Sequence, residues 1–332
     1  MRLLFRKLSY KTKKVENSQM RNERRVIKRK RKKVRWGRVF LLLFILIGGI
    51  LGIYLYSQYK SGVEQSRKSV GDKQDVYEFK GKQDANGSTN ILILGSDATG
   101  RDKPRADTIM IGSYNKSKGT YKLVSVMRDS YVDIPGHGKN KINAAFAYGG
   151  PELLRKTIKN NFDVDLQYYA VVDFEGFVKL MDEAFPNGVK VDVEKRMEEN
   201  IDVTIEPGVQ QLDGEHLLGY VRFRQDAVGD FGRVERQQKV IKDVGNQLVS
   251  ISTVPKLPKL VGVVMPYVNT NMGTGDMLYI AKGFVSKDNR NIETMRIPVN
   301  GSFEDKRVSG SGLVLDIDQE VNKAELQGFL AK

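Results

Sequence analysis

The chain has 332 residues, no cysteine and a formal net charge of +15. The absence of cysteine excludes a thiol nucleophile, a thiolate zinc site and disulfide bonds. The positive charge belongs to one segment, because residues 1–38 contain 17 Lys or Arg and two Glu, while residues 39–332 are formally neutral. A basic tail of this kind does not by itself indicate a folded face that binds nucleic acid.

An uncharged segment follows the basic tail. Residues 39–59, VFLLLFILIGGILGIYLYSQY, contain no charged side chain, and a helix of this length covers about 30 Å, the thickness of the hydrocarbon core of a bilayer. Basic residues flank only its first end, so we predict a membrane anchor with residues 1–38 in the cytoplasm and the rest outside the cell. A cleaved signal peptide is the alternative, but the segment is long for one and no Ala-x-Ala site follows.

Segments typical of strands and helices alternate after a polar stretch. Residues 60–89 are predicted to be a stalk or linker. Strands are predicted at residues 91–95, 108–114, 121–126, 168–172 and 188–193, and helices at residues 150–162 and 174–185, with Asp173 as the N-cap of the second helix. This alternation favours an α/β fold with helices on the faces of a sheet. We expect a domain at residues 90–250, which residues 251–332 complete or extend.

Two carboxylates stand next to predicted strand ends in residues 90–110, NILILGSDATGRDKPRADTIM. Asp97 follows one strand, Asp107 precedes the next, and Arg105 lies two residues before Asp107. Magnesium is commonly bound by one or two carboxylates together with phosphate oxygens and water. Both acids are also ordinary turn residues, which is the alternative interpretation. The spacing of Gly95 and Gly100 does not indicate a nucleotide-binding loop, because Lys and Ser or Thr do not follow.

Basic side chains cluster in two further places. Arg128 follows the strand that ends near residue 127, and Lys141 lies in a predicted loop beyond it. Arg222 and Arg224 alternate with apolar residues, and in an extended segment their guanidinium groups would point the same way.

A helix is predicted to follow these two arginines. Asp230 is expected to cap it, and Arg233 and Gln237 would share one of its faces. Guanidinium groups bind phosphate oxygens in a bidentate manner, so the arginines and the paired acids together favour a pyrophosphate site. A solvated charged face is the alternative.

Residues 90–110, 125–143 and 217–238 resemble the motifs of the LytR–CpsA–Psr family, membrane-anchored enzymes of Gram-positive cell-wall assembly. The resemblance implies a central mixed β-sheet flanked by helices on both faces, behind one N-terminal transmembrane helix. It implies that Asp97 and Asp107 bind Mg²⁺ (or Mn²⁺), and that Asp97, Arg105, Asp107 and Arg128 are catalytic. The side chains that it implies for pyrophosphate binding are Arg105, Arg128, Arg222, Arg224, Arg233 and Gln237, and we add Lys141 as a further candidate. Met127 departs from the family pattern, in which Pro is frequent.

The resemblance also implies an activity. A phosphotransferase would join a polyprenyl-pyrophosphate-linked anionic glycopolymer, of teichoic acid or capsule type, to the muramic acid 6-hydroxyl of peptidoglycan and release polyprenyl phosphate. A pyrophosphatase side activity would be compatible with such a site, and Asp97 is an alternative base toward the acceptor hydroxyl. The partners would be the lipid-linked polymer, peptidoglycan and membrane lipid, and no nucleic acid. The candidates for a lipid groove are Phe146, Phe162, Phe174 and Phe177. A non-catalytic receptor for wall polymer and a membrane-bound regulator remain the alternatives.

Overall fold

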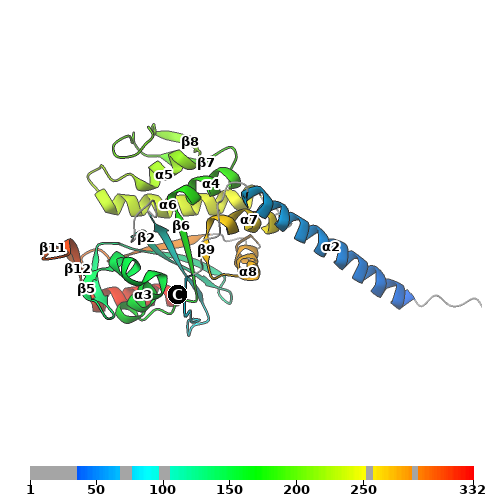
Figure 1. Cartoon of the computed structure of the whole chain (residues 1–332), viewed down its shortest axis with the longest axis horizontal. Coiled ribbons are helices and arrows are strands. Elements are labelled where there is room, and N and C mark those ends of the chain that lie inside the picture. The colour runs from blue at the N-terminus through cyan, green and yellow to red at the C-terminus, as the bar shows by residue number, and fades with distance from the viewer. Residues whose placement is uncertain (1–35, 68–76, 97–104, 252–256, 286–290) are drawn as a thin grey trace, which may run out of the picture. The chain divides into compact units, whose positions relative to one another are not determined.

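The computed structural model describes residues 36–67, 77–96, 105–251, 257–285 and 291–332 (Figure 1). The chain divides into two compact units, residues 1–51 and residues 52–332. The first described helix, α2 (Trp36–Arg67), crosses this division. Its residues 60–67 are helical, although we predicted a stalk without regular structure from residue 60 onward.

The predicted membrane anchor lies within α2. In the part of the chain that the structure describes, no helix combines the length and the hydropathy that a membrane span requires. The side chains of residues 39–43, at the start of the predicted anchor, lie outside the described part, as do residues 1–35 of the basic tail. The anchor and its orientation therefore stay predictions.

Six strands form the central mixed sheet, in the order β10-β3-β2-β1-β6-β9. Strands β1, β2 and β3 form an antiparallel meander, β6 and β10 add parallel strands to β1 and β3, and β9 closes the other edge antiparallel to β6. The bounds are Thr89–Ser96 for β1, Ala106–Asn115 for β2, Thr120–Val126 for β3, Tyr168–Asp173 for β6, Asn269–Thr270 for β9 and Ile292–Ile297 for β10. The predicted first three strands agree with β1, β2 and β3 to within two residues.

One face of this sheet packs on helices α3 (Ile142–Phe162) and α9 (Gln319–Ala331). Leu92 and Leu94 of β1 and Ile109 of β2 are almost fully buried there, because alternate side chains of a strand point to the same face. Helix α3 begins earlier than the predicted start at residue 150. Its turns are interrupted at Gly149 and Gly150, and Gly150 has φ 61°, a conformation that favours glycine.

Helices on the opposite face enclose a second core (Figure 1). They are α4 (Phe174–Ala184), α5 (Gly214–Arg222), α6 (Gly229–Ile251) and α7 (Leu257–Val264), and the hairpin of β7 (Val189–Val193) and β8 (Gly208–Leu212) packs with them. The Asp173 side chain accepts a hydrogen bond from the Gly176 amide and caps α4, as predicted. The protein thus has a mixed α/β fold in which helices flank a central mixed sheet.

A smaller sheet of four strands, in the order β11-β12-β4-β5, lies beyond the end of β3. Its bounds are Ser130–Ile134 for β4, Gly138–Lys141 for β5, Phe303–Val308 for β11 and Gly312–Ile317 for β12, and the remaining short elements are η2 (Met265–Tyr267) and α8 (Thr274–Val285). Lys141 is therefore at the end of a strand and not in the predicted loop. Residues 257–332 supply both edge strands of the central sheet.

The last turns of α2 pack against α7 through two glycines. A Cβ atom on Gly62 would lie 2.3 Å from the Lys259 carbonyl oxygen, and one on Gly262 would lie 2.4 Å from that of Tyr59. The Ser66 hydroxyl also donates a hydrogen bond of 3.0 Å to the Val263 carbonyl. The end of α2 is thus an integral part of the unit formed by residues 52–332.

Candidate functional site

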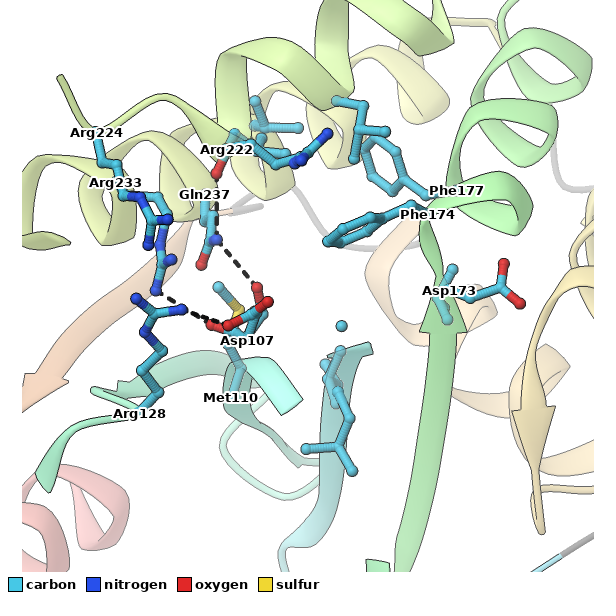
Figure 2. A pocket seen from close by; sticks show the side chains of 18 of the residues that line it. Asp107, Met110, Arg128, Asp173, Phe174, Phe177, Arg222, Arg224, Arg233 and Gln237 are labelled. Atoms are coloured by element: carbon cyan, nitrogen blue, oxygen red, sulfur yellow. Dashed lines mark hydrogen bonds and ion pairs between the residues drawn. The ribbon is translucent and has the colours of Figure 1, made fainter. Parts of the chain in front are cut away.

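A pocket of about 920 Å³ lies between the central sheet and helices α4, α5 and α6 (Figure 2). One side is polar and the other is apolar. The charged or amide side chains that line it on or near the polar side are Arg105, Asp107, Arg128, Asp129, Lys141, Asn143, Arg224, Arg233 and Gln237. The structure therefore brings together most of the predicted site residues from three distant parts of the sequence.

Asp107 and Arg128 form the centre of the polar side. Asp107 is the second residue of β2, and Arg128 follows the end of β3, the neighbouring antiparallel strand. Their side chains form a hydrogen-bonded ion pair. Burial alone would lower the pKa of Arg128, but the carboxylates of Asp230 and Asp107 outweigh it and raise this pKa above its usual value. Arg128 is therefore a permanent cation that faces the pocket.

Arg233 reaches the same place from the first turns of α6. Its Nη2 atom donates hydrogen bonds to the Asp107 carbonyl oxygen at 3.2 Å and to Asp230 Oδ2 at 3.0 Å. The side chain is 7% exposed, and burial lowers its pKa from the usual value. We predicted that Asp230 caps the helix, whereas it lies inside the first turn of α6 and binds Arg233, with its other oxygen 3.9 Å from Arg128.

Gln237 lies one turn further along α6. Its Nε2 atom donates to the Thr108 hydroxyl at 3.0 Å and to the Val221 carbonyl at 3.3 Å. The side-chain oxygen of Gln237 faces the Asp107 side of the pocket in Figure 2. Gln237 therefore connects the end of α5 to β2 in addition to lining the pocket.

Arg222 and Arg224 do not lie in an extended segment, contrary to our prediction. Helix α5 begins after the capping residue Asp213 and ends at Arg222, because Phe223 has φ −59° and ψ 134°, outside the helical region. The Arg222 guanidinium extends over the Phe174 ring, 4.8 Å from its centre, on the apolar side (Figure 2). Arg224 lies on the other side of the pocket with Arg233. The two arginines therefore reach opposite sides of the pocket.

Lys141 and Asp129 line the pocket from the smaller sheet. Lys141 Nζ lies 2.7 Å from Asp129 Oδ1, and Arg128 Nε lies 3.5 Å from Asp129 Oδ2. Asp129 thus holds two basic side chains of the pocket at once. Arg105, which is exposed, lines the pocket just before β2 begins.

The apolar side is formed mainly by α4. Phe174, Phe177, Leu180 and Met181 line it, and Val221 and Val240 contribute from α5 and α6. Of the four phenylalanines that we considered for a lipid groove, Phe174 and Phe177 are in this wall. Phe146 and Phe162 are not, because they are buried in the core between α3 and the other face of the sheet.

Of the two predicted metal ligands, only Asp107 lies within the described residues. Asp97 belongs to residues 97–104, which lie outside the described residues. Among the residues that are described, no three His, Asp or Glu side chains gather closely enough to hold a metal ion. Asp107 does present a carboxylate to the pocket, which fits one ligand of a hard cation whose other ligands are phosphate oxygens and water.

Sequence reasoning missed the structural roles of Asp129, Asp230 and Thr108. Asp129 was visible only as the neighbour of Arg128, and such pairs are usually surface ion pairs of little energetic value. Thr108 was visible only as a strand residue. Their roles depend on which strands become neighbours, and the local sequence does not specify this.

Comparison with known proteins identifies the family. The LytR_cpsA_psr family model matches residues 53–325. The chain belongs to the LytR–CpsA–Psr family. Among its relatives in this family, regulatory protein MsrR of Staphylococcus aureus is 42% identical over 280 residues, 84% of this chain and 85% of that protein. A protein of Oceanobacillus iheyensis named polyisoprenyl-teichoic acid–peptidoglycan teichoic acid transferase TagU is 31% identical over 327 residues, 93% of this chain and 98% of the relative.

Solved structures of the family share the fold. Bacillus subtilis TagV superposes with a TM-score of 0.64 at 26% identity, covering 73% of this chain and 95% of TagV. A structure of TagT bound to LIIa-WTA gives a TM-score of 0.62 at 26% identity and covers 77% of this chain and 98% of TagT. The LytR–CpsA–Psr family thus includes relatives named as teichoic acid transferases.

Proposed function

We propose that this protein is a membrane-anchored phosphotransferase that joins a polyprenyl-pyrophosphate-linked anionic glycopolymer to the muramic acid 6-hydroxyl of peptidoglycan and releases polyprenyl phosphate. The observation that carries the proposal is the two-sided pocket, in which guanidinium groups lie opposite an aromatic and aliphatic wall. A lipid pyrophosphate has the same division between a charged group and an apolar chain. The relatives named as teichoic acid transferases support the choice of substrate.

The polar side provides what phosphoryl transfer mainly requires, which is positioning and neutralisation of charge. Arg128, Arg224 and Arg233 lie on one side of the pocket, where their planar groups would bind phosphate oxygens. Because Arg128 is half-buried, Arg233 is buried and both are held by acids, they need little reorganisation when a substrate binds.

In the proposed reaction, the acceptor hydroxyl oxygen attacks the phosphorus atom that carries the glycan. A new P–O bond forms, the phosphoanhydride bond breaks, and polyprenyl phosphate leaves with the electron pair. The hydroxyl proton passes to a base, for which Asp97 is the candidate. We propose that Asp97 and Asp107 also hold Mg²⁺ (or Mn²⁺), which would supply further positive charge to the phosphates.

We further propose that residues 39–59 anchor the protein in the cell membrane of a Gram-positive bacterium, with the N-terminus in the cytoplasm and the catalytic domain outside. The uncharged sequence and its one-sided basic flank support this orientation. Protease added to intact protoplasts should then digest residues 60–332. Full protection of this part would contradict the proposed topology.

The test of activity uses the full-length protein in detergent, with lipid-linked polymer, magnesium and uncrosslinked peptidoglycan. We expect covalent polymer–peptidoglycan product from the wild type. Arg224→Ala should weaken donor binding by about 1.5–3 kcal/mol, the usual contribution of a hydrogen bond to a charged group, and Arg224→Lys should restore little because the guanidinium geometry is lost. Arg196→Ala is the matched control, since Arg196 is exposed and lies outside the pocket. A wild type that binds donor but forms no product would indicate a receptor instead.

A further inference from the structure

One buried arginine next to the pocket has no role in the proposed reaction. Arg236 lies on α6, one residue before Gln237, and its side chain is 5% exposed. It does not line the pocket. Besides Glu194, its hydrogen-bond partners lie in residues 223–229, the segment that connects α5 to α6 and carries Arg224.

Arg236 holds the first part of this segment. Its Nη2 atom donates a hydrogen bond to the carbonyl oxygen of Phe223, and its guanidinium carbon lies 5.3 Å from the centre of the Phe223 ring. The Gln237 side-chain amide donates a hydrogen bond to the Val221 carbonyl oxygen. The two backbone carbonyls on either side of Arg222 are therefore both fixed by α6.

Arg236 also holds the last part of the segment, through Asp226. Arg236 Nη1 donates to Asp226 Oδ2 at 3.1 Å and to Glu194 Oε1 at 3.3 Å. The other oxygen of Asp226 accepts the backbone amides of Val228 at 3.1 Å and Gly229 at 2.8 Å, where α6 begins. One guanidinium group thus connects both ends of the segment that carries Arg224.

The acid in this arrangement is charged at neutral pH. Burial alone would raise the pKa of Asp226, but hydrogen bonds from Lys195, the Gly229 amide and Arg236 lower this pKa to about 2. The Asp226–Arg236 hydrogen bond therefore joins two ions, and such bonds are about twice as strong as neutral ones.

The site needs a restraint of this kind because its cations repel one another. Burial is the main cause of the lowered pKa of Arg233, and the positive charges of Arg128 and, to a smaller extent, Arg224 lower it further, while Asp230 and Asp107 raise it. Without a bound anion, an unrestrained segment would move Arg224 away from the other two. Binding would then require that Arg224 be ordered again, which would weaken the affinity.

We propose that Arg236, together with Asp226, is a positioning residue that holds residues 222–229 in the conformation that binds pyrophosphate. The ligand in this statement rests on the proposed function, whereas the restraint itself rests on the contacts of Arg236. Arg236 does not touch the substrate. It determines where Arg224 is before the substrate arrives.

The experiment compares the full-length wild type with Arg236→Lys, which keeps the charge and loses the forked geometry. Hydrogen exchange of the amides at residues 222–229 should become faster by about tenfold or more, as expected for the loss of a hydrogen bond to a charged group. The control is Arg155→Lys, because Arg155 is 13% exposed and makes two hydrogen bonds to Glu152 on α3, away from this segment. Asp226→Asn tests the same restraint with a smaller change if Arg236→Lys does not fold.

Binding of inorganic pyrophosphate and farnesyl pyrophosphate gives the second measurement. Arg236→Lys should bind both probes about tenfold more weakly, and Arg224→Ala should cost less in the Arg236→Lys background than in the wild type. The positioning role would be overturned if Arg236→Lys left amide exchange at residues 222–229 unchanged or bound the two probes as tightly as the wild type. It would also be overturned if the effects of Arg224→Ala and Arg236→Lys on binding were additive. A wild type that binds neither probe, while Arg236→Lys still makes exchange at residues 222–229 faster, would overturn the proposed function and leave the restraint standing, so the two failures are distinguishable.

Discussion

The arginines of the pocket differ in how strongly the fold depends on them. Arg233 is buried and bonded to Asp230 and to the Asp107 backbone, whereas Arg224 is exposed. Removal of one partner from a buried ion pair leaves the other charge without compensation. Arg233 therefore contributes both to the fold and to the site, and Arg224 only to the site.

We expect Arg233→Met to lower the free energy of unfolding by about 3–5 kcal/mol. Arg196→Met is the control, because Arg196 makes only exposed ion pairs with Glu198 and Glu206, and these are worth about 0–1 kcal/mol. Urea denaturation followed by far-UV circular dichroism measures the free energy of unfolding of both variants. Equal losses of stability in the two variants would contradict the view that the ion pair of Arg233 with Asp230 is buried.

The contribution of Asp226 to the free energy of unfolding should depend on pH. Its pKa is about 2 in the folded protein and about 3.9 in an unfolded chain, so the unfolded state binds the proton more readily. The stabilisation is complete above about pH 4 and is lost as the pH falls toward about 2. The stability difference between wild type and Asp226→Asn should therefore narrow over this range. Urea midpoints at several pH values test this, and a constant difference would exclude the effect.

Membership of the pocket could be predicted from the sequence for residues whose side-chain chemistry is specific. Arg128, Arg233 and Gln237 were chosen from sequence and lie together in the structure. Arg222 was expected beside Arg224, yet it contacts Phe174, because the segment that ends at Arg222 is helical. The alternation of apolar and basic residues over four positions fits a strand and also the last turn of an amphipathic helix, and local pattern alone does not decide between them.

Among the secondary-structure elements, the crossing of α2 and α7 has a strict steric requirement on both helices. The two helices approach so closely that the added Cβ atoms would overlap backbone oxygens. The sequence did not reveal this crossing, because Gly62 and Gly262 are far apart in the chain and neither belongs to a recognisable motif. The strands β1 to β3 were predictable, in contrast, because each is a short apolar run bounded by turn residues.

We expect Gly262→Ala to lower the melting temperature and to free the end of α2 from α7, because its Cβ atom would lie 2.4 Å from the Tyr59 carbonyl oxygen. Gly52→Ala is the matched control on α2, since nothing lies within 4 Å of a Cβ atom there, and alanine is the better helix former. Thermal unfolding measures both variants. A Gly262→Ala protein as stable as wild type would show that the helices do not cross this closely.

The folded unit of residues 52–332 is assembled from both ends of its sequence. Strand β10 pairs with β3, and α9 packs on α3. We expect a chain that ends at residue 290 to lose cooperative unfolding, because β3 loses its partner on one edge and the core loses Leu326 and Leu330. A chain that begins at residue 52 should keep cooperative unfolding, since residues 1–51 form a separate unit. Calorimetry distinguishes the two, and a cooperative transition in the chain ending at residue 290 would contradict this expectation.

The pairing of β10 with β3 also has a consequence for the order of events during synthesis. All described residues that line the pocket have been synthesised by Ile241, but the second partner of β3 begins only at Ile292. At about 5–20 residues per second, the nascent chain therefore exposes an unpaired strand edge for a few seconds. A newly made molecule passes through an aggregation-prone interval just before its pocket becomes stable. Factors that bind nascent chains should matter most for this protein during that interval.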